Sequence, residues 1–170
     1  MTATLFENAH ILDGTADTAV PGHVLVEDGR IKDVSDKPIA ASAARKVDLK
    51  GRTLMPGLID AHVHVIASEV NLARHALLPD ALVAFRAAKI MQAMLMRGFT
   101  TIRDLGGATQ GLRAARDEGH FDAPRMVICG KAISATGGHS DARGRLDTRD
   151  NGWVESRLGA RGRIADGEAA

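Results

Sequence analysis

The sequence predicts an α/β protein in two parts, a small all-β unit followed by the first units of a parallel sheet with helical crossovers. Residues 4–54 form short alternating runs separated by Gly-containing turns, a pattern typical of β-strands. After Pro56-Gly57, short apolar runs alternate with longer runs of helical period. The resulting β-α-β-α-β order favours a parallel sheet with right-handed crossovers. We therefore expect two domains, residues 1–55 and residues 56–170.

Three stretches of the first part are predicted as strands. Residues 4–14 alternate between apolar and polar side chains. Residues 23–35 are two short runs that meet at Asp28-Gly29, a strong hairpin signal because this dipeptide tolerates the positive φ angles of a tight turn. Residues 46–57 contain two further short runs, so the whole segment indicates an all-β unit.

The second part begins with residues 58–66, a nearly continuous apolar run of the kind found in strands buried in parallel sheets. Residues 78–98 follow as a helix, with Pro79 suited to its start and Gly98 to its end. Apolar residues near the helical period predict the buried stripe of this helix, namely Leu82, Phe85, Ala88, Ile90, Met94 and Leu95.

Two more strands and one helix complete the pattern. Residues 99–107 are predicted as a strand, residues 109–119 as a helix and residues 124–134 as a third strand. From Ala135 on, the last 36 residues are rich in Gly, Arg and Asp. This composition predicts a long loop, and loops of that length are usually functional or disordered.

The bulk composition excludes several classes of partner. Lys plus Arg (22) nearly balance Asp plus Glu (21), so the net charge of +1 favours neither nucleic acid nor a membrane as partner. The aromatic content of 3% is too low for stacking platforms that bind single strands. The single cysteine, Cys129, cannot form an internal disulfide, which predicts a cytoplasmic protein, and its apolar neighbours favour a core position over a nucleophile. The sequence shows no signal peptide and no apolar run of about 20 residues.

His62 and His64 stand two residues apart in the stretch "PGLIDAHVHV". Residues i and i+2 of a strand point to the same face, so the two imidazoles can bind one ion. Asp60 lies one step earlier on that face and is a candidate for orienting a ligand from the second coordination sphere. The spacing alone leaves open a second interpretation, two satisfied polar side chains at a strand end. The position at the carboxyl end of a first β-α strand favours the metal, because catalytic groups gather there in β/α barrels.

Three stretches together resemble one family. "PGLIDAHVH" resembles the metal-binding signature of the amidohydrolase superfamily, and "RGFTTIRDLGG" resembles its second barrel strand and the turn that follows. "GKAISATGGHSD" resembles the third strand and loop of the imidazolonepropionase-like and Xaa-Pro dipeptidase-like branch. The resemblance runs from residue 4 to about residue 145 and weakly beyond.

The resemblance implies a (β/α)8 TIM barrel, preceded by a small β-sandwich segment, with one or two divalent metals, usually zinc. His62 and His64 match the two ligands of the first strand. The family's carboxylated lysine, two later histidines and late aspartate have no counterpart here, and Lys131 does not match the lysine position. A barrel takes about 250 residues, whereas 114 remain from Gly57 to Ala170, so we expect the N-terminal part of a longer enzyme.

A histidine on the loop after the third predicted strand is a further candidate. The resemblance suggests that His139, which follows two glycines, lines the substrate pocket and binds a carboxylate or carbonyl oxygen, with Asp141 orienting it. The alternative is a solvated loop histidine. In the family the Arg103-Asp104 pair lies near the site, although a structural salt bridge between them is an equally good interpretation.

The remaining polar residues are interpreted as surface or loop groups. The four other histidines lack partner spacing and are assigned to surfaces or loops: His10, His23, His75 and His120. The arginines of the last stretch are interleaved with acidic residues, which favours a solvated loop over a binding patch. Trp153 has two open roles, capping the site or anchoring that loop.

The predicted activity is metal-assisted hydrolysis of a C–N bond in a small amide, cyclic amide or dipeptide. A divalent ion lowers the pKa of water from about 16 to about 7 and polarises the substrate carbonyl. In the family that the sequence resembles, the late aspartate shuttles the proton. Because this aspartate has no counterpart here, we expect the 170-residue chain alone to be inactive. Two alternatives are a non-catalytic fragment that binds a partner through an open sheet edge, and an unrelated α/β binding protein with structural histidines. A homo-oligomer is left open.

Overall fold

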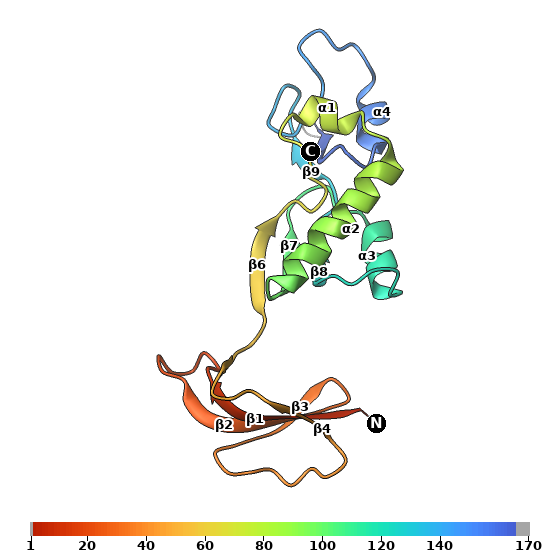
Figure 1. Cartoon of the computed structure of the whole chain (residues 1–170). Helices are drawn as coiled ribbons and strands as arrows, with labels where there is room; N and C mark the ends of the chain where they lie inside the picture. Colours follow the sequence, from red (N-terminus) through yellow and green to blue (C-terminus); the bar gives the residue numbers. More distant parts are fainter. Residues whose placement is uncertain (1, 166–170) are drawn as a thin grey trace. The chain divides into compact units, whose positions relative to one another are not determined.

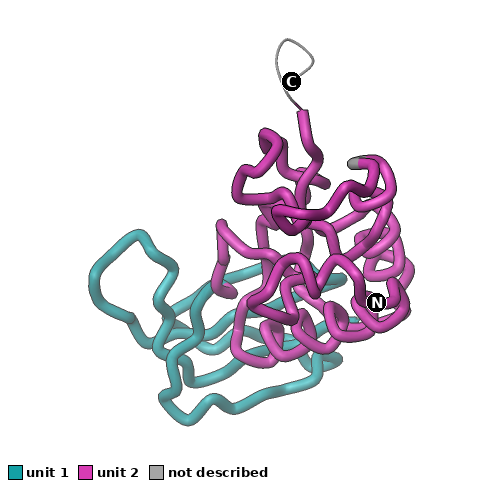
Figure 2. The backbone as a smooth tube through the Cα atoms, turned by 90° about the horizontal axis from the view of Figure 1, so that it is seen from above, with its two compact units in different colours: residues 1–56 teal, residues 57–170 magenta. Residues whose placement is uncertain are grey.

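The computed structural model describes residues 2–165 and divides into two compact units, residues 1–56 and residues 57–170. Figure 2 shows the two units in different colours. In the part of the chain that is described, no helix is long and apolar enough to span a bilayer.

The first unit is a five-stranded sheet with the order β3-β2-β1-β4, in which β5 also pairs with β1 (Figure 1). Its strands are β1 (Ala3–Ile11), β2 (Val20–Glu27), β3 (Arg30–Ser35), β4 (Arg45–Asp48) and β5 (Thr53–Leu54). The predicted hairpin at Asp28-Gly29 is confirmed, since both residues have positive φ (48° and 77°) between the antiparallel strands β2 and β3. β4 and β5 pair in parallel with β1 rather than with each other.

The second unit contains a parallel sheet with the order β6-β7-β8, as the β-α-β-α-β pattern predicts. Its strands are β6 (Leu58–Val63), β7 (Phe99–Asp104) and β8 (Arg125–Ile128), joined through α2 (Asp80–Met96) and α3 (Gln110–Asp117). The single strand predicted over residues 124–134 is wrong. The strand β8 ends at Ile128, and the backbone turns at Gly130, which has a φ of 80°. The chain then continues as β9 (Ala132–Ser134), which belongs to another sheet.

The stretch from Ala135 is more regular than the predicted loop. It contains α4 (Asn151–Ser156) and β10 (Gly162–Ile164), and β10 pairs in parallel with β9. A small apolar cluster holds the stretch against α1 (Leu72–Ala76), a short helix that the sequence pattern did not predict. The cluster consists of Ala76, Ala142, Val154 and Ala160.

The assignment of His75 to the surface is wrong. Its side chain is 1% exposed, and its Nδ1 lies 2.7 Å from the carbonyl oxygen of Gly159, which is 84 residues further along the chain. His75 is therefore buried because the stretch after residue 135 packs on α1, a contact that no local pattern encodes. His120 is on the surface as expected and pairs with Glu118.

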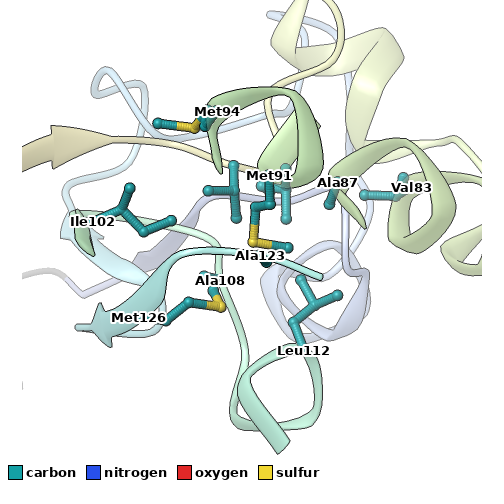
Figure 3. Close-up of a cluster of buried hydrophobic side chains, with 11 residues drawn as sticks. Val83, Ala87, Met91, Met94, Ile102, Ala108, Leu112, Ala123 and Met126 are labelled. Atoms are coloured by element: carbon teal, nitrogen blue, oxygen red, sulfur yellow. The ribbon is translucent and has the colours of Figure 1, made fainter. Parts of the chain in front are cut away.

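The main core of the second unit lies between α2, α3 and the parallel sheet (Figure 3). α2 contributes Val83, Ala87, Met91 and Met94 to it. The predicted stripe is correct in part: Met94 is buried and Ile90 packs against this core, whereas Leu82 and Phe85 are exposed, Phe85 by 78%. α2 carries apolar side chains around most of its surface, so periodicity alone does not select the face that meets the sheet.

Cys129 was predicted to lie in the core, and this prediction is wrong. Its side chain is exposed, while Met126 of the same apolar run is 3% exposed. The run leaves the sheet at Ile128, where β8 ends, so Cys129 already belongs to the connection toward β9.

Two methionines of α2 provide a matched test of this core. Met91 is fully buried and Met96 is 81% exposed. We expect Met91→Ala to lower the free energy of unfolding by about 2–5 kcal/mol, because it leaves a cavity. Met96→Ala is expected to change it by less than about 0.5 kcal/mol. Urea unfolding of both variants measures the difference, and equal losses would contradict the assignment of the buried face.

Candidate metal centre

The two candidate ligands lie side by side at the end of β6. The ring centroids of His62 and His64 are 5.5 Å apart with an angle of 77° between the ring planes. His62 is exposed and His64 is half-buried, so both rings are reachable from solvent. The pairing of β6 with β7 is irregular between Asp60 and Val63, where β6 has one more residue than its partner. Such bulges re-aim side chains and are frequent beside active sites.

One ring nitrogen of His64 is already engaged. Its Nδ1 lies 3.0 Å from the carbonyl oxygen of Gly106. A carbonyl only accepts hydrogen bonds, so Nδ1 carries the proton and donates it. In the neutral imidazole, Nε2 then keeps its lone pair for a metal ion, which is the arrangement common among metal-binding histidines.

Gly106 lies where several segments converge. A Cβ atom at this position would lie 3.2 Å from Cβ of Ala132, 3.4 Å from the carbonyl oxygen of Arg161 and 3.5 Å from Cε1 of His64. The absence of a side chain lets β9, β10 and the His64 ring approach one another closely.

Asp60 and Arg103 both fix the backbone around His62. Oδ1 of Asp60 accepts the backbone N–H of His62 at 3.2 Å, so its contact is with the main chain of a candidate ligand. Nε of Arg103 donates to the carbonyl oxygen of Ala61 at 2.8 Å. Within residues 2–165, no ion pair joins Arg103 to Asp104, so the salt-bridge interpretation of this pair is wrong.

Asp104 is the residue whose role the sequence analysis missed. Its side chain is fully buried, and its carboxylate accepts N–H groups from Val65 at 2.7 Å, Gly106 at 2.9 Å and Ala108 at 3.2 Å. The signal in the sequence is an aspartate at a strand end before two glycines, a setting in which Asp side chains bind nearby backbone N–H groups.

His139 and Asp141 lie on the loop after β9. His139 is exposed, and no hydrogen bond or ring contact among residues 2–165 joins it to His62 or His64. Asp141 accepts the N–H of Gly137 at 2.9 Å and pairs with Arg143 at 2.8 Å, so it orders the loop rather than the His139 ring. The hydrogen bonds from Arg143 hold the pKa of Asp141 well below its usual value.

Lys131 connects the end of the sheet to the later stretch. Its Nζ donates to the carbonyl oxygens of Arg157, at 2.6 Å, and of Ala160. Burial lowers the pKa of Lys131, against the opposing attraction of Asp80 and Glu155. Trp153 serves the same stretch, since its ring lies against the guanidinium groups of Arg149, at 4.8 Å, and Arg157, at 5.8 Å. Of its two open roles, these contacts favour anchoring of the stretch.

The described residues fit a divalent metal in part. Two imidazoles at one strand end suit zinc and related ions, and the bond from His64 to Gly106 leaves the correct nitrogen available. Across residues 2–165, no third His, Cys, Asp or Glu completes a cluster with them. A catalytic zinc usually has three protein ligands, so this pair alone would fall one ligand short of that number.

The chain is similar in sequence and fold to several known proteins. A crystal structure of an amidohydrolase is 48% identical with a TM-score of 0.90, over 98% of this chain and 41% of that one. A prolidase crystallised with N-methylphosphonate-L-proline is 41% identical with a TM-score of 0.92, again over 98% and 41%. The dihydroorotase of Elusimicrobium minutum is 39% identical over 61 residues, which are 36% of this chain and 14% of that protein. The chain thus spans less than half the length of these relatives.

A family model settles the superfamily that the three sequence stretches suggested. The model of the amidohydrolase family matches residues 53–168, which include the histidine pair at the end of β6 and Asp104 at the end of β7. The match extends over more than half of the chain, and the solved relatives include enzymes of the Xaa-Pro dipeptidase type. The chain belongs to the amidohydrolase family.

Proposed function

We propose that this chain contributes the metal ligands of the first barrel strand, His62 and His64, to a metal centre. That centre hydrolyses C–N bonds in small amides or dipeptides. The observation that carries the proposal is the geometry of the histidine pair, with rings 5.5 Å apart and Nδ1 of His64 bonded to Gly106. Family relatives named dihydroorotase, L-hydantoinase and prolidase are enzymes that act on C–N bonds, which supports the reaction class.

Each candidate residue has a distinct part in this proposal. His62 and His64 hold one or two divalent ions, with zinc as the first choice because imidazole nitrogen suits it. When bound, such an ion lowers the pKa of water toward neutrality and polarises a carbonyl. Asp60 fixes the backbone of His62 through the 3.2 Å contact and thereby the direction of that ring. His139, on the exposed loop after β9, binds the carboxylate or carbonyl oxygen of the substrate.

The surrounding architecture is part of the same proposal. The parallel order β6-β7-β8 with its crossover helices is the start of a (β/α)8 barrel, with residues 56–170 as its first units. Residues 1–55 supply one sheet of the β-sandwich segment, and this sheet bears an apolar groove of about 360 Å³ lined by residues such as Phe6, Val24 and Ile31. The prolidase likeness at 41% identity favours a dipeptide among the substrate classes. A cytoplasmic location belongs to the proposal as well.

A second function is a binding protein without catalysis. It is favoured by the absence of a third ligand in the described range, residues 2–165. In that case β8 forms an open edge of its sheet, since it pairs on one side with β7 only. Metal-dependent turnover by the product of the complete reading frame that contains these residues would exclude this alternative.

The histidine pair makes a direct prediction about metal binding. Loss of a partner in the outer coordination sphere weakens metal affinity about 10- to 100-fold, so His62→Ala and His64→Ala are each expected to weaken Co²⁺ affinity by at least about 100-fold. Visible absorption during a Co²⁺ titration measures this. His120→Ala is the matched control because His120 is exposed and its ring pairs with Glu118, away from the histidine pair in sequence. Equal affinities in all three variants would contradict the assignment.

His139 makes a separate prediction about substrate. If it binds a charged oxygen, His139→Ala removes a bond worth about 1.5–3 kcal/mol and raises KM for Xaa-Pro dipeptides about 10- to 100-fold, with little change in kcat. Steady-state kinetics of the product of the complete reading frame measure both constants. An unchanged KM would assign His139 to solvent.

A further inference from the structure

We propose that Asp104 is the positioning residue that fixes the ring of His64 and leaves its Nε2 directed outward for a ligand. This inference rests on the proposed function only for the identity of that ligand, since the contacts that carry it lie within the protein.

The first step is the number of donors that meet at one side chain. Oδ2 of Asp104 accepts from the backbone N–H of Val65, and Oδ1 accepts from those of Gly106 and Ala108. The side chain is 0% exposed, and no cation pairs with it among residues 2–165. Backbone N–H groups therefore compensate the desolvation of this carboxylate.

The second step is the position of those donors relative to His64. Val65 directly follows His64, so Oδ2 holds the peptide group on the carboxyl side of the histidine. Gly106 is held from two directions, because its N–H donates to Oδ1 and its carbonyl oxygen accepts from Nδ1 of His64. Asp104 thus determines where the histidine backbone lies and where the acceptor for its ring lies.

The third step is the requirement for a carboxylate. Both oxygens accept, one on each side of the side chain. An asparagine has one acceptor oxygen, and its NH2 group would face an N–H donor on the other side. The loop after β6 and the loop after β7 then cannot both be held, and Nδ1 of His64 loses its fixed acceptor.

The first experiment needs no substitution and no metal. Long-range ¹H–¹⁵N spectra of the ring nitrogens of the wild-type chain are expected to show His64 protonated at Nδ1 and bare at Nε2. The backbone amides of Val65, Gly106 and Ala108 are expected to exchange slowly with D2O because they donate to a buried acceptor. A His64 protonated at Nε2, or rapid exchange of these amides, overturns the proposal.

The second experiment is the substitution Asp104→Asn, with Asp122→Asn as the matched control because Asp122 is exposed. We expect Asp104→Asn to mix the two ring tautomers of His64 and to weaken Co²⁺ affinity about 10- to 100-fold. We expect Asp122→Asn to leave both unchanged. A residue with a purely structural role would lower the melting temperature and leave the tautomer of the folded fraction unaltered, and that result overturns the proposal.

The outcomes separate this proposal from the proposed function. If the wild-type chain binds no Co²⁺ while its His64 tautomer depends on Asp104, the metal function fails and the positioning role stands. If Co²⁺ binds to the histidine pair with equal affinity in Asp104→Asn, and the His64 tautomer is unaltered, the positioning role fails and the metal function stands. If Asp104→Asn does not fold, the wild-type ring spectrum decides.

Discussion

Three backbone N–H groups converge on the buried carboxylate of Asp104, and the local geometry around His64 depends on this contact. An unpaired charge in the interior would be prohibitively costly, so the donors must stay in place whenever this region is folded. These donors belong to the connections that follow β6 and β7. Val65, in the first connection, is 39 residues away in sequence from Asp104, which ends β7. One side chain therefore ties two loops together at the carboxyl ends of adjacent strands.

The segments that follow build on this junction through close packing at Gly106. His64, Ala132 and Arg161 all approach the position where its Cβ would be. Ala132 begins β9, and Arg161 directly precedes β10, so the small second sheet of this unit lies against the junction. Lys131 adds a further tie through its bonds to Arg157 and Ala160. The late stretch of the chain thus packs around Gly106, the residue whose carbonyl oxygen accepts from His64.

Features encoded in neighbouring residues could be predicted from the sequence, and features that depend on distant contacts could not. The Asp28-Gly29 hairpin and the limits of α2 follow from local backbone preferences, and the parallel order follows from the alternation of elements. The burial of His75 depends on Gly159, 84 residues away. The buried face of α2 depends on which side meets the sheet, because apolar residues surround the helix.

The candidate site, too, could be predicted where neighbouring residues encode it and could not where it depends on distant contacts. The spacing of His62 and His64 predicted that their rings lie side by side, although β6 ends at Val63, before His64, and the bulge in β6 was not foreseen. The acceptor for Nδ1 of His64 is a backbone carbonyl of another loop, and no side-chain motif encodes it. The sequence indicated Asp104 only as part of the Arg103-Asp104 pair at a strand end. Its three backbone donors could not be predicted, because they meet only when the fold brings the two loops together.

Crystals of the chain soaked with Zn²⁺, with diffraction data collected at the zinc absorption edge, test the central claim most directly. The account predicts one dominant anomalous peak in contact with both His62 and His64, on the side of the His64 ring that bears Nε2, with the contact from Nδ1 to Gly106 intact. A peak at His139 or His75 with none at the pair, or zinc bound through Nδ1 of His64, would contradict it.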